Sequence, residues 1–233
     1  MAQPGGRRMY LGMAGTALLL LGGCASHQRS SAKVDEEWVA RVPQSQLGDV
    51  RQAQLTEDEA REQLPRARVA TQDAEQALEV ARRNEAAAKA RHEADALALK
   101  AAKETGDLAA IQKARGAACD SQHALTLAQA ETAWRNDAVD TLKSLEVVRE
   151  RELDVASAQL QQAQYEAVSA NKDVRARDMS SGDFSSAVAD ARRRAADQQR
   201  QADERLQREN QAKAHWEQLR DQGYGGGGMQ QAP

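Results

Sequence analysis

The residue types that bind metals or carry out acid–base chemistry are few in this chain and widely spaced. Cys119 and His123 are the closest combination, because residues four apart on a helix share one face. A metal site would need one or two further ligands from another element, and the sequence has no Cys/His cluster with zinc spacing. We therefore expect a small buried cysteine beside a surface histidine, and no bound metal. The remaining histidines are His27, His92 and His215.

Motifs for catalysis are also missing from the sequence. It has no His-Glu-x-x-His or Gly-x-Ser-x-Gly pattern, and no glycine-rich loop stands between a strand and a helix to bind phosphate. Adjacent carboxylates such as Asp58 and Glu59, and the basic run at 192–194, are typical of solvated helix faces. We expect no catalytic residue and no cofactor, and therefore a protein that is not an enzyme.

The first 24 residues differ in composition from the rest of the chain. Arg7 and Arg8 are the only charged residues before Cys24, and an apolar run follows from position 10 to position 21. A basic start, a short apolar segment and small residues at its end predict a secretory signal peptide, since the run is too short for a stable membrane span. The sequence therefore predicts export from the cytoplasm.

The end of this leader, Leu21-Gly22-Gly23-Cys24, resembles the lipobox of bacterial lipoproteins. The resemblance covers the leader only. It implies that residues 1–23 are removed and that Cys24 carries acyl chains such as palmitate, which hold the protein to a membrane. In enteric lipoproteins an Asp after the cysteine favours retention in the inner membrane. Ala25 and Ser26 follow Cys24 here, and the absence of Asp resembles outer-membrane sorting, so we expect the chain to face the periplasm from that membrane. Export by the Sec route or by the twin-arginine route stays open.

Composition favours long helices over a sphere. Of the 233 residues, 47 are Ala and only one is Phe, and Ala is the best helix former. Loss of the leader lowers the net charge from −3 to −5, which argues against a nucleic-acid partner. Only Cys119 then remains as a thiol, so an intrachain disulfide is excluded and a bridge between two copies stays open.

Break residues divide the mature chain. Thr56 and Glu59 form a capping-box pattern, and Pro65 predicts a kink or a restart of the helix. Gly106 and Gly182 predict turns between helices. The fold class is therefore all-α: a long antiparallel, alanine-rich coiled-coil hairpin plus a third helix. The expected segments are a lipidated Cys and tether at 24–50, the coiled coil at 51–221 with helices at about 56–104, 107–178 and 183–221, and a disordered tail at 222–233.

Apolar residues recur at alternating steps of three and four along these helices, which is the signature of a coiled coil. In the first helix the steps run through 53, 56, 60, 63 and so on to 102, mostly Ala; in the second they run from 111 to 174. Antiparallel folding at the two turns places residue 67 opposite 145 and residue 216 opposite 146. Arg135, Glu146 and Arg149 fall within the second stripe, where polar groups can fix register.

These observations lead to a functional hypothesis without a specific activity. We expect a non-enzymatic, lipid-anchored envelope protein that acts as a structural or adaptor coiled coil in the periplasm. Its partners would be the membrane, through the acyl chains on Cys24, and other envelope proteins; a homo-oligomer stays open. Two alternatives are a periplasmic chaperone-like protein and a helical accessory subunit of an export or motility assembly. For the first, the sequence near 100–110 offers only Leu97, Leu99, Leu108 and Ile111 as apolar residues that could bind clients.

Overall fold

The computed structural model describes residues 33–225, and the leader with Cys24 and the tail at 226–233 lie outside them. Every regular element in this part of the chain is helical, so the all-α prediction is confirmed. The elements are α1 (Glu36–Val39), η1 (Gln44–Gln46), α2 (Gly48–Thr105), α3 (Leu108–Ala170), η2 (Val174–Asp178) and α4 (Ser181–Gly225).

The two longest helices form the predicted antiparallel hairpin. α2 has 58 residues and α3 has 63, which correspond to lengths of about 87 and 95 Å at 1.5 Å per residue. Gly106 ends α2 with a φ of 74°, a left-handed conformation that glycine adopts without strain, and the Asp107 carboxylate caps α3. Arg68 lies 3.2 Å from Glu146, so the predicted pairing of residue 67 with residue 145 is confirmed.

The seam of the hairpin contains alternate three- and four-residue steps on both helices. On α3 it follows the predicted stripe from Ile111 to Ala167. On α2 the predicted stripe is wrong at every second position: residues 57, 64, 71, 78, 85, 92 and 99 enter the seam instead of their preceding neighbours. The α2 residues of the seam are Val50, Ala53, Glu57, Ala60, Leu64, Ala67, Thr71, Ala74, Leu78, Ala81, Glu85, Ala88, His92, Asp95, Leu99 and Ala102, all buried or half-buried; Ala70 and Ala77 beside the seam are also half-buried.

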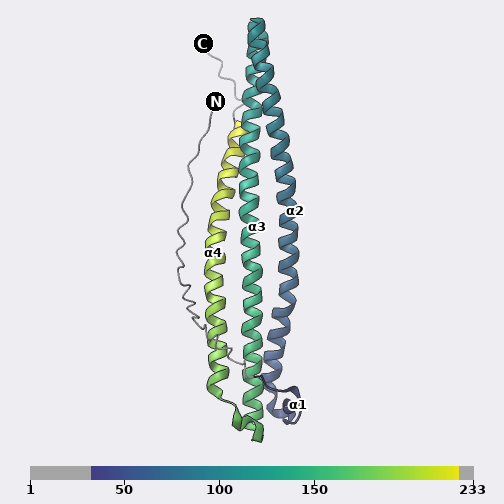
Figure 1. The fold of residues 1–233 in the computed structure, drawn as a ribbon, viewed down its shortest axis with the longest axis vertical. Coiled ribbons are helices and arrows are strands. Elements are labelled where there is room, and N and C mark those ends of the chain that lie inside the picture. The colour runs from purple at the N-terminus through teal and green to yellow at the C-terminus, as the bar shows by residue number, and fades with distance from the viewer. Residues whose placement is uncertain (1–32, 226–233) are drawn as a thin grey trace, which may run out of the picture. The chain divides into compact units, whose positions relative to one another are not determined.

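α4 packs on the opposite side of α3 from α2, so α3 is the middle helix of a layer (Figure 1). α2 and α4 make no more than marginal contact with each other. α3 therefore carries a second seam, and α4 meets it with a heptad stripe of its own. The α3 residues are Ala130, Trp134, Asp137, Thr141, Ser144, Val148, Arg151, Val155, Ala158, Gln162 and Tyr165; the α4 residues are Phe184, Val188, Ala191, Ala195, Gln198, Ala202, Arg205, Glu209, Ala212, Trp216 and Leu219.

Residues 33–47 pack onto one end of the hairpin, which we call the base, rather than forming the predicted tether up to residue 50. Val34 and Val42 are 1% and 5% exposed and belong to a core with Val168 and Phe184. The Val34 amide donates to Gln161 Oε1 at 2.9 Å. Trp38 packs against this core, with the Arg175 guanidinium 5.7 Å from its ring centre. The base is thus the best-packed part of the described chain.

α2 begins at Gly48, eight residues before the predicted start at 56. Val50 is 2% exposed in the base core, and its burial extends the helix beyond the capping-box pattern. Thr56 is therefore not an N-cap, and its hydroxyl donates to the Gln52 carbonyl inside the helix. Pro65 is exposed within α2 and does not end it, because a proline removes only one backbone hydrogen bond from a helix held by packing along its length.

α3 ends at Ala170 and not at 178, because Lys172 adopts a φ of 59° and the Asp173 carboxylate caps the 3₁₀ turn η2. This earlier turn changes the pairing of α4 with α3. Trp216 stacks on Trp134 with ring centres 4.8 Å apart, so the predicted pairing of residue 216 with residue 146 is wrong. α4 also runs to Gly225, beyond the predicted end at 221.

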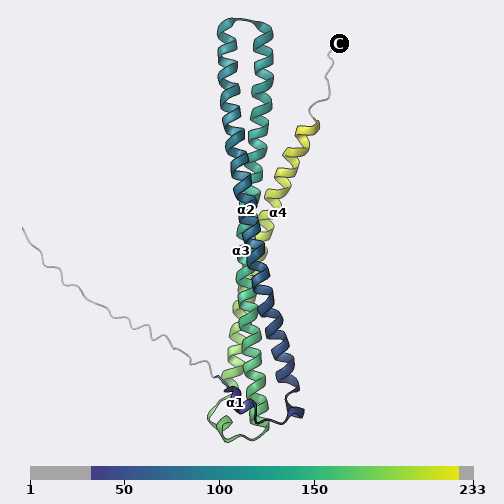
Figure 2. The same cartoon turned by 90° about the vertical axis from the view of Figure 1, so that its right-hand side faces the viewer.

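Beyond the end of α4 the hairpin continues as two helices (Figure 2). We call residues 85–128 the arm. The seam of the arm is less apolar than the core of the base, because Glu85, His92 and Asp95 occupy seam positions on α2. His92 Nδ1 lies 3.4 Å from Ser121 Oγ across the seam. Leu97 and Leu108, near the turn, are 68% and 76% exposed.

Candidate functional site

The residues singled out for metal chemistry are not arranged as a site. Cys119 is exposed and His123 is half-buried, so the expected buried cysteine beside a surface histidine is wrong. Within residues 33–225 no group of three or more His, Cys, Asp and Glu side chains is placed to hold a metal ion. Cys24, the predicted lipidation site, lies outside the described residues.

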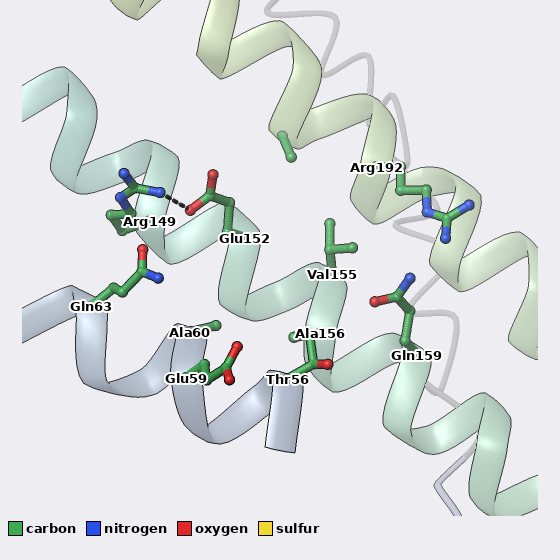
Figure 3. A pocket seen from close by; sticks show the side chains of 11 residues that line it. Thr56, Glu59, Ala60, Gln63, Arg149, Glu152, Val155, Ala156, Gln159 and Arg192 are labelled. Atoms are coloured by element: carbon green, nitrogen blue, oxygen red, sulfur yellow. Dashed lines mark hydrogen bonds and ion pairs between the residues drawn. The ribbon is translucent and has the colours of Figure 1, made fainter. Parts of the chain in front are cut away.

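The three long helices instead line a groove of about 470 Å³ close to the base (Figure 3). Small apolar side chains come from each helix, including Ala60 of α2, Ala156 of α3 and Ala195 of α4. Polar and charged side chains surround them. The full lining is Thr56, Glu59, Ala60, Gln63, Arg149, Glu152, Val155, Ala156, Gln159, Arg192 and Ala195.

Heptad positions explain which face of the layer holds this groove. Thr56 and Gln63 directly precede seam residues of α2, and Glu152 and Gln159 directly precede seam residues of α3. Two seam residues three apart on one helix are flanked by one residue just before them and one just after them. These two flanking residues lie on opposite sides of the coiled coil. The groove therefore lies on one side of the layer, which we call the groove face.

Charges in the groove are divided between its walls. In the middle, Arg149 pairs with Glu152 at 2.6 Å, drawn as the dashed line in Figure 3. On the α2 wall, the Glu59 carboxylate has no hydrogen bond or ion pair with any described residue, and the same holds for the Arg192 guanidinium on the α4 wall. The groove is thus acidic along one wall and basic along the other, with both of these charges available to a ligand.

The other side of the layer, which we call the ion-pair face, has its charges matched between helices. Arg68 contacts Glu146 at 3.2 Å and Glu150 at 3.4 Å. Lys143 contacts Glu75 at 2.7 Å, and the hydrogen bond and charge of that carboxylate raise the pKa of Lys143. These pairs link α2 to α3 where the groove face has none among the described residues.

A cluster of aromatic and basic side chains fastens the C-terminal part of α4. The Trp134–Trp216 stack has Arg135 4.0 Å from the Trp134 ring centre and Arg220 5.0 Å from that of Trp216. Each guanidinium is therefore placed for a cation–π contact. Because the indole rings stack on each other and on cations, we assign this cluster to holding α4 against α3.

No helix among the described residues is long and apolar enough to span a membrane. No protein-family model, curated protein or solved structure matches the chain.

Sequence reasoning did not find the groove. The α2 stripe it selected includes Thr56 and Gln63, which line the groove and do not fill the seam. The sequence did contain a signal for the groove. Between residues 130 and 165, α3 has a second series of residues at three- and four-residue steps, and most of their side chains are small or polar. Two such series on one helix imply a partner helix on each side of it.

Proposed function

We propose that the chain is a non-enzymatic, lipid-anchored envelope protein of the bacterial outer membrane, whose helices act as a structural or adaptor element in the periplasm. The observation that carries this proposal is the α2–α3 hairpin, whose α2 side of the seam is alanine-rich from Val50 to Ala102. Such a hairpin presents long outer faces to partners, whereas an enzyme needs an enclosed pocket with convergent polar groups.

Anchoring at Cys24 would determine which end of the hairpin lies near the bilayer. Lys33, the first described residue, is nine positions after Cys24. Nine extended residues reach at most about 30 Å. Acyl chains on Cys24 would therefore hold the base near the bilayer, and the turn at Gly106, at the opposite end of the hairpin, would be the part farthest from it.

The anchor is tested by labelling cells with radioactive palmitate. The native chain should be labelled and Cys24→Ser should not, because the other cysteine is not preceded by the lipobox residues. Cys119→Ser is the matched control and should keep the label in full. Label on Cys24→Ser, or its absence from the native chain, would contradict the proposal.

A second candidate function is client binding, and the exposed leucines near the turn favour it. Leu97 and Leu108 are 68% and 76% exposed, although Leu99 and Ile111 are half-buried in the seam. If the turn binds unfolded clients, the full chain should suppress the aggregation of a chemically denatured model enzyme. The double variant Leu97→Gln/Leu108→Gln should abolish this effect. Leu55→Gln, an exposed leucine near the base, is the control.

A further inference from the structure

We infer that the groove face is the interface of a parallel homodimer, in which a second copy of this chain packs groove to groove about a two-fold axis that runs along the helices. Such an axis places α3 over α3 of the partner, and α2 of each copy over α4 of the other. The inference rests on the layer arrangement, on the charges of the groove walls and on the side chains along the groove face.

The charge arrangement is self-complementary under this symmetry. Glu59 of α2 and Arg192 of α4 line the same groove, so they lie at the same height along the helices. Rotation about the axis brings Glu59 of each copy to Arg192 of the other, and two ion pairs form from groups that have no ion pair within the described chain. An antiparallel dimer would not bring these two residues together at one height.

Side-chain size along the groove face fits the same arrangement. Residues seven apart keep the same side of a coiled-coil helix. From Gln63 this series leads to Ala70 and Ala77 on α2, and from Glu152 it leads to Leu145 and Ala138 on α3; all four are half-buried. On α4 it leads from Arg192 through the exposed Gln199 to Leu206, which is 43% exposed. Between the groove and the arm, the groove face is thus apolar on α2 and α3, where the ion-pair face is charged.

In the middle of the interface the same acidic residue of each copy meets its counterpart, and the repulsion between the two negative charges must be offset. Glu152 of the two copies would face each other across the axis. Each is already paired with its own Arg149 at 2.6 Å, so the four side chains can form a neutral network. On the α2 and α3 part of the ion-pair face, by contrast, Arg68, Glu75, Lys143 and Glu150 are paired within the chain.

The polarity of the dimer agrees with the proposed function, and this one argument rests on it. Two chains anchored through Cys24 in the same leaflet start from the same surface, so their helices run in the same direction. The pairing of Glu59 with Arg192 and the apolar groove face do not depend on the anchor.

A charge-swap experiment tests the interface. The full chain, in detergent with micelles in excess, should sediment as a dimer, and Glu59→Arg or Arg192→Glu should each weaken dimerisation about tenfold. The double variant Glu59→Arg/Arg192→Glu should restore it. Glu93→Arg and Arg194→Glu, exposed and away from the groove, are the matched controls and should dimerise as the native chain does. A monomeric native chain, or single variants that the double variant does not rescue, would overturn the inference.

Cross-linking tests the polarity. In a Cys119→Ser chain, Gln159→Cys should give a dimer with a short thiol cross-linker, because the two Gln159 side chains lie at one height in a parallel dimer. Ser157→Cys, which directly follows a seam residue and so lies on the other face, should not. Cross-linking of Ser157→Cys instead would reject the groove face. Cys24→Ser should still dimerise, and association seen only in the acylated chain would assign it to the lipid and overturn the inference.

Discussion

The base and the arm are built from the same two helices, yet they are packed differently. At the base, Val34, Val168 and Phe184 are at most 2% exposed. In the arm, Ser121 and Leu125 are the only buried residues of the range 85–128. The difference comes from neighbours: the base is covered by α4 and residues 33–47, whereas the arm has only its own two helices.

This comparison shows that a regular heptad pattern does not give uniform stability. Burial of apolar area is the main favourable term in folding, and an Ala-rich two-helix seam buries little of it. Segments with few buried apolar contacts open more readily than the rest of a protein. We therefore expect the base to resist unfolding and the arm to exchange its amide hydrogens first.

The largest expected effect is at the base. Phe184→Ala removes a side chain that is 2% exposed and stacks on Tyr165 at 4.7 Å. Loss of a buried Phe lowers the free energy of unfolding by about 3–5 kcal/mol. Leu99→Ala in the half-buried arm seam should cost about 1 kcal/mol. Urea unfolding followed by circular dichroism measures both, and equal losses would remove the distinction between base and arm.

Trp216→Ala should free the C-terminal part of α4 without unfolding the hairpin. It removes the Trp134 stack and a contact with Arg220, a loss of about 2 kcal/mol for a half-buried aromatic pair. Hydrogen exchange should rise in α4 beyond Arg205 and stay unchanged in α2. Trp216→Phe keeps an aromatic ring and should preserve most of the protection. A uniform rise over all helices would contradict this assignment.

Asp95→Leu should stabilise the arm. Asp95 Oδ2 is buried without a hydrogen-bond partner in the described chain, and Arg91 Nε is 3.8 Å away, which is too long for a hydrogen bond. The side chain is 25% exposed and its ion pair with Arg91 is lost as well, so removing the unsatisfied oxygen should add about 1 kcal/mol. Slower hydrogen exchange in the arm is the expected result. Asp120→Leu, an exposed position on α3, should have little effect.

Two glycines of the arm predict smaller effects of opposite sign. A Cβ at Gly116 would meet no atom within 4 Å, so Gly116→Ala should stabilise α3 by about 0.5–1 kcal/mol. Gly106 has a φ of 74°, and Gly106→Ala should cost about 1 kcal/mol. Thermal unfolding measures the two variants side by side, and a change of the same sign in both would contradict the turn geometry.

The smallest effect concerns pH. Glu75 raises the pKa of Lys143, so the folded chain holds this proton more tightly than the unfolded chain. The contribution of the pair is therefore present below the ordinary lysine pKa and is lost as pH rises through the raised value. The Lys143→Gln variant should lack the part of the loss of folding stability at alkaline pH that is due to this pair. Thermal unfolding between pH 9 and pH 11.5 measures the difference from the native chain.

Much of the fold could be predicted because heptads and turn residues are local signals. Gly106 fixed the first turn, and the pairing of Arg68 with Glu146 follows from it. The α2 frame could not be fixed in the same way. Ala70 and Ala77 lie beside the seam and Ala67 and Ala74 within it, and a methyl side chain does not distinguish the two positions.

The errors at helix ends share one physical cause, which is packing between distant segments. Val50 joins α2 because the base core buries it, although Thr56 offers a better local cap. α3 stops at Ala170 although the apolar stripe continues to Val174. The groove also depends on α4 lying opposite α2, an arrangement that no local motif encodes.

The burial of Val34 has a mechanical consequence. Any tension that reaches the described chain from residue 32 enters at Val34, whose amide is bonded to Gln161 of α3 at 2.9 Å. The load therefore passes directly to the middle helix instead of peeling α2 from its first turn. A tethered molecule of this design would transmit force along α3 while its outer helices stay in place.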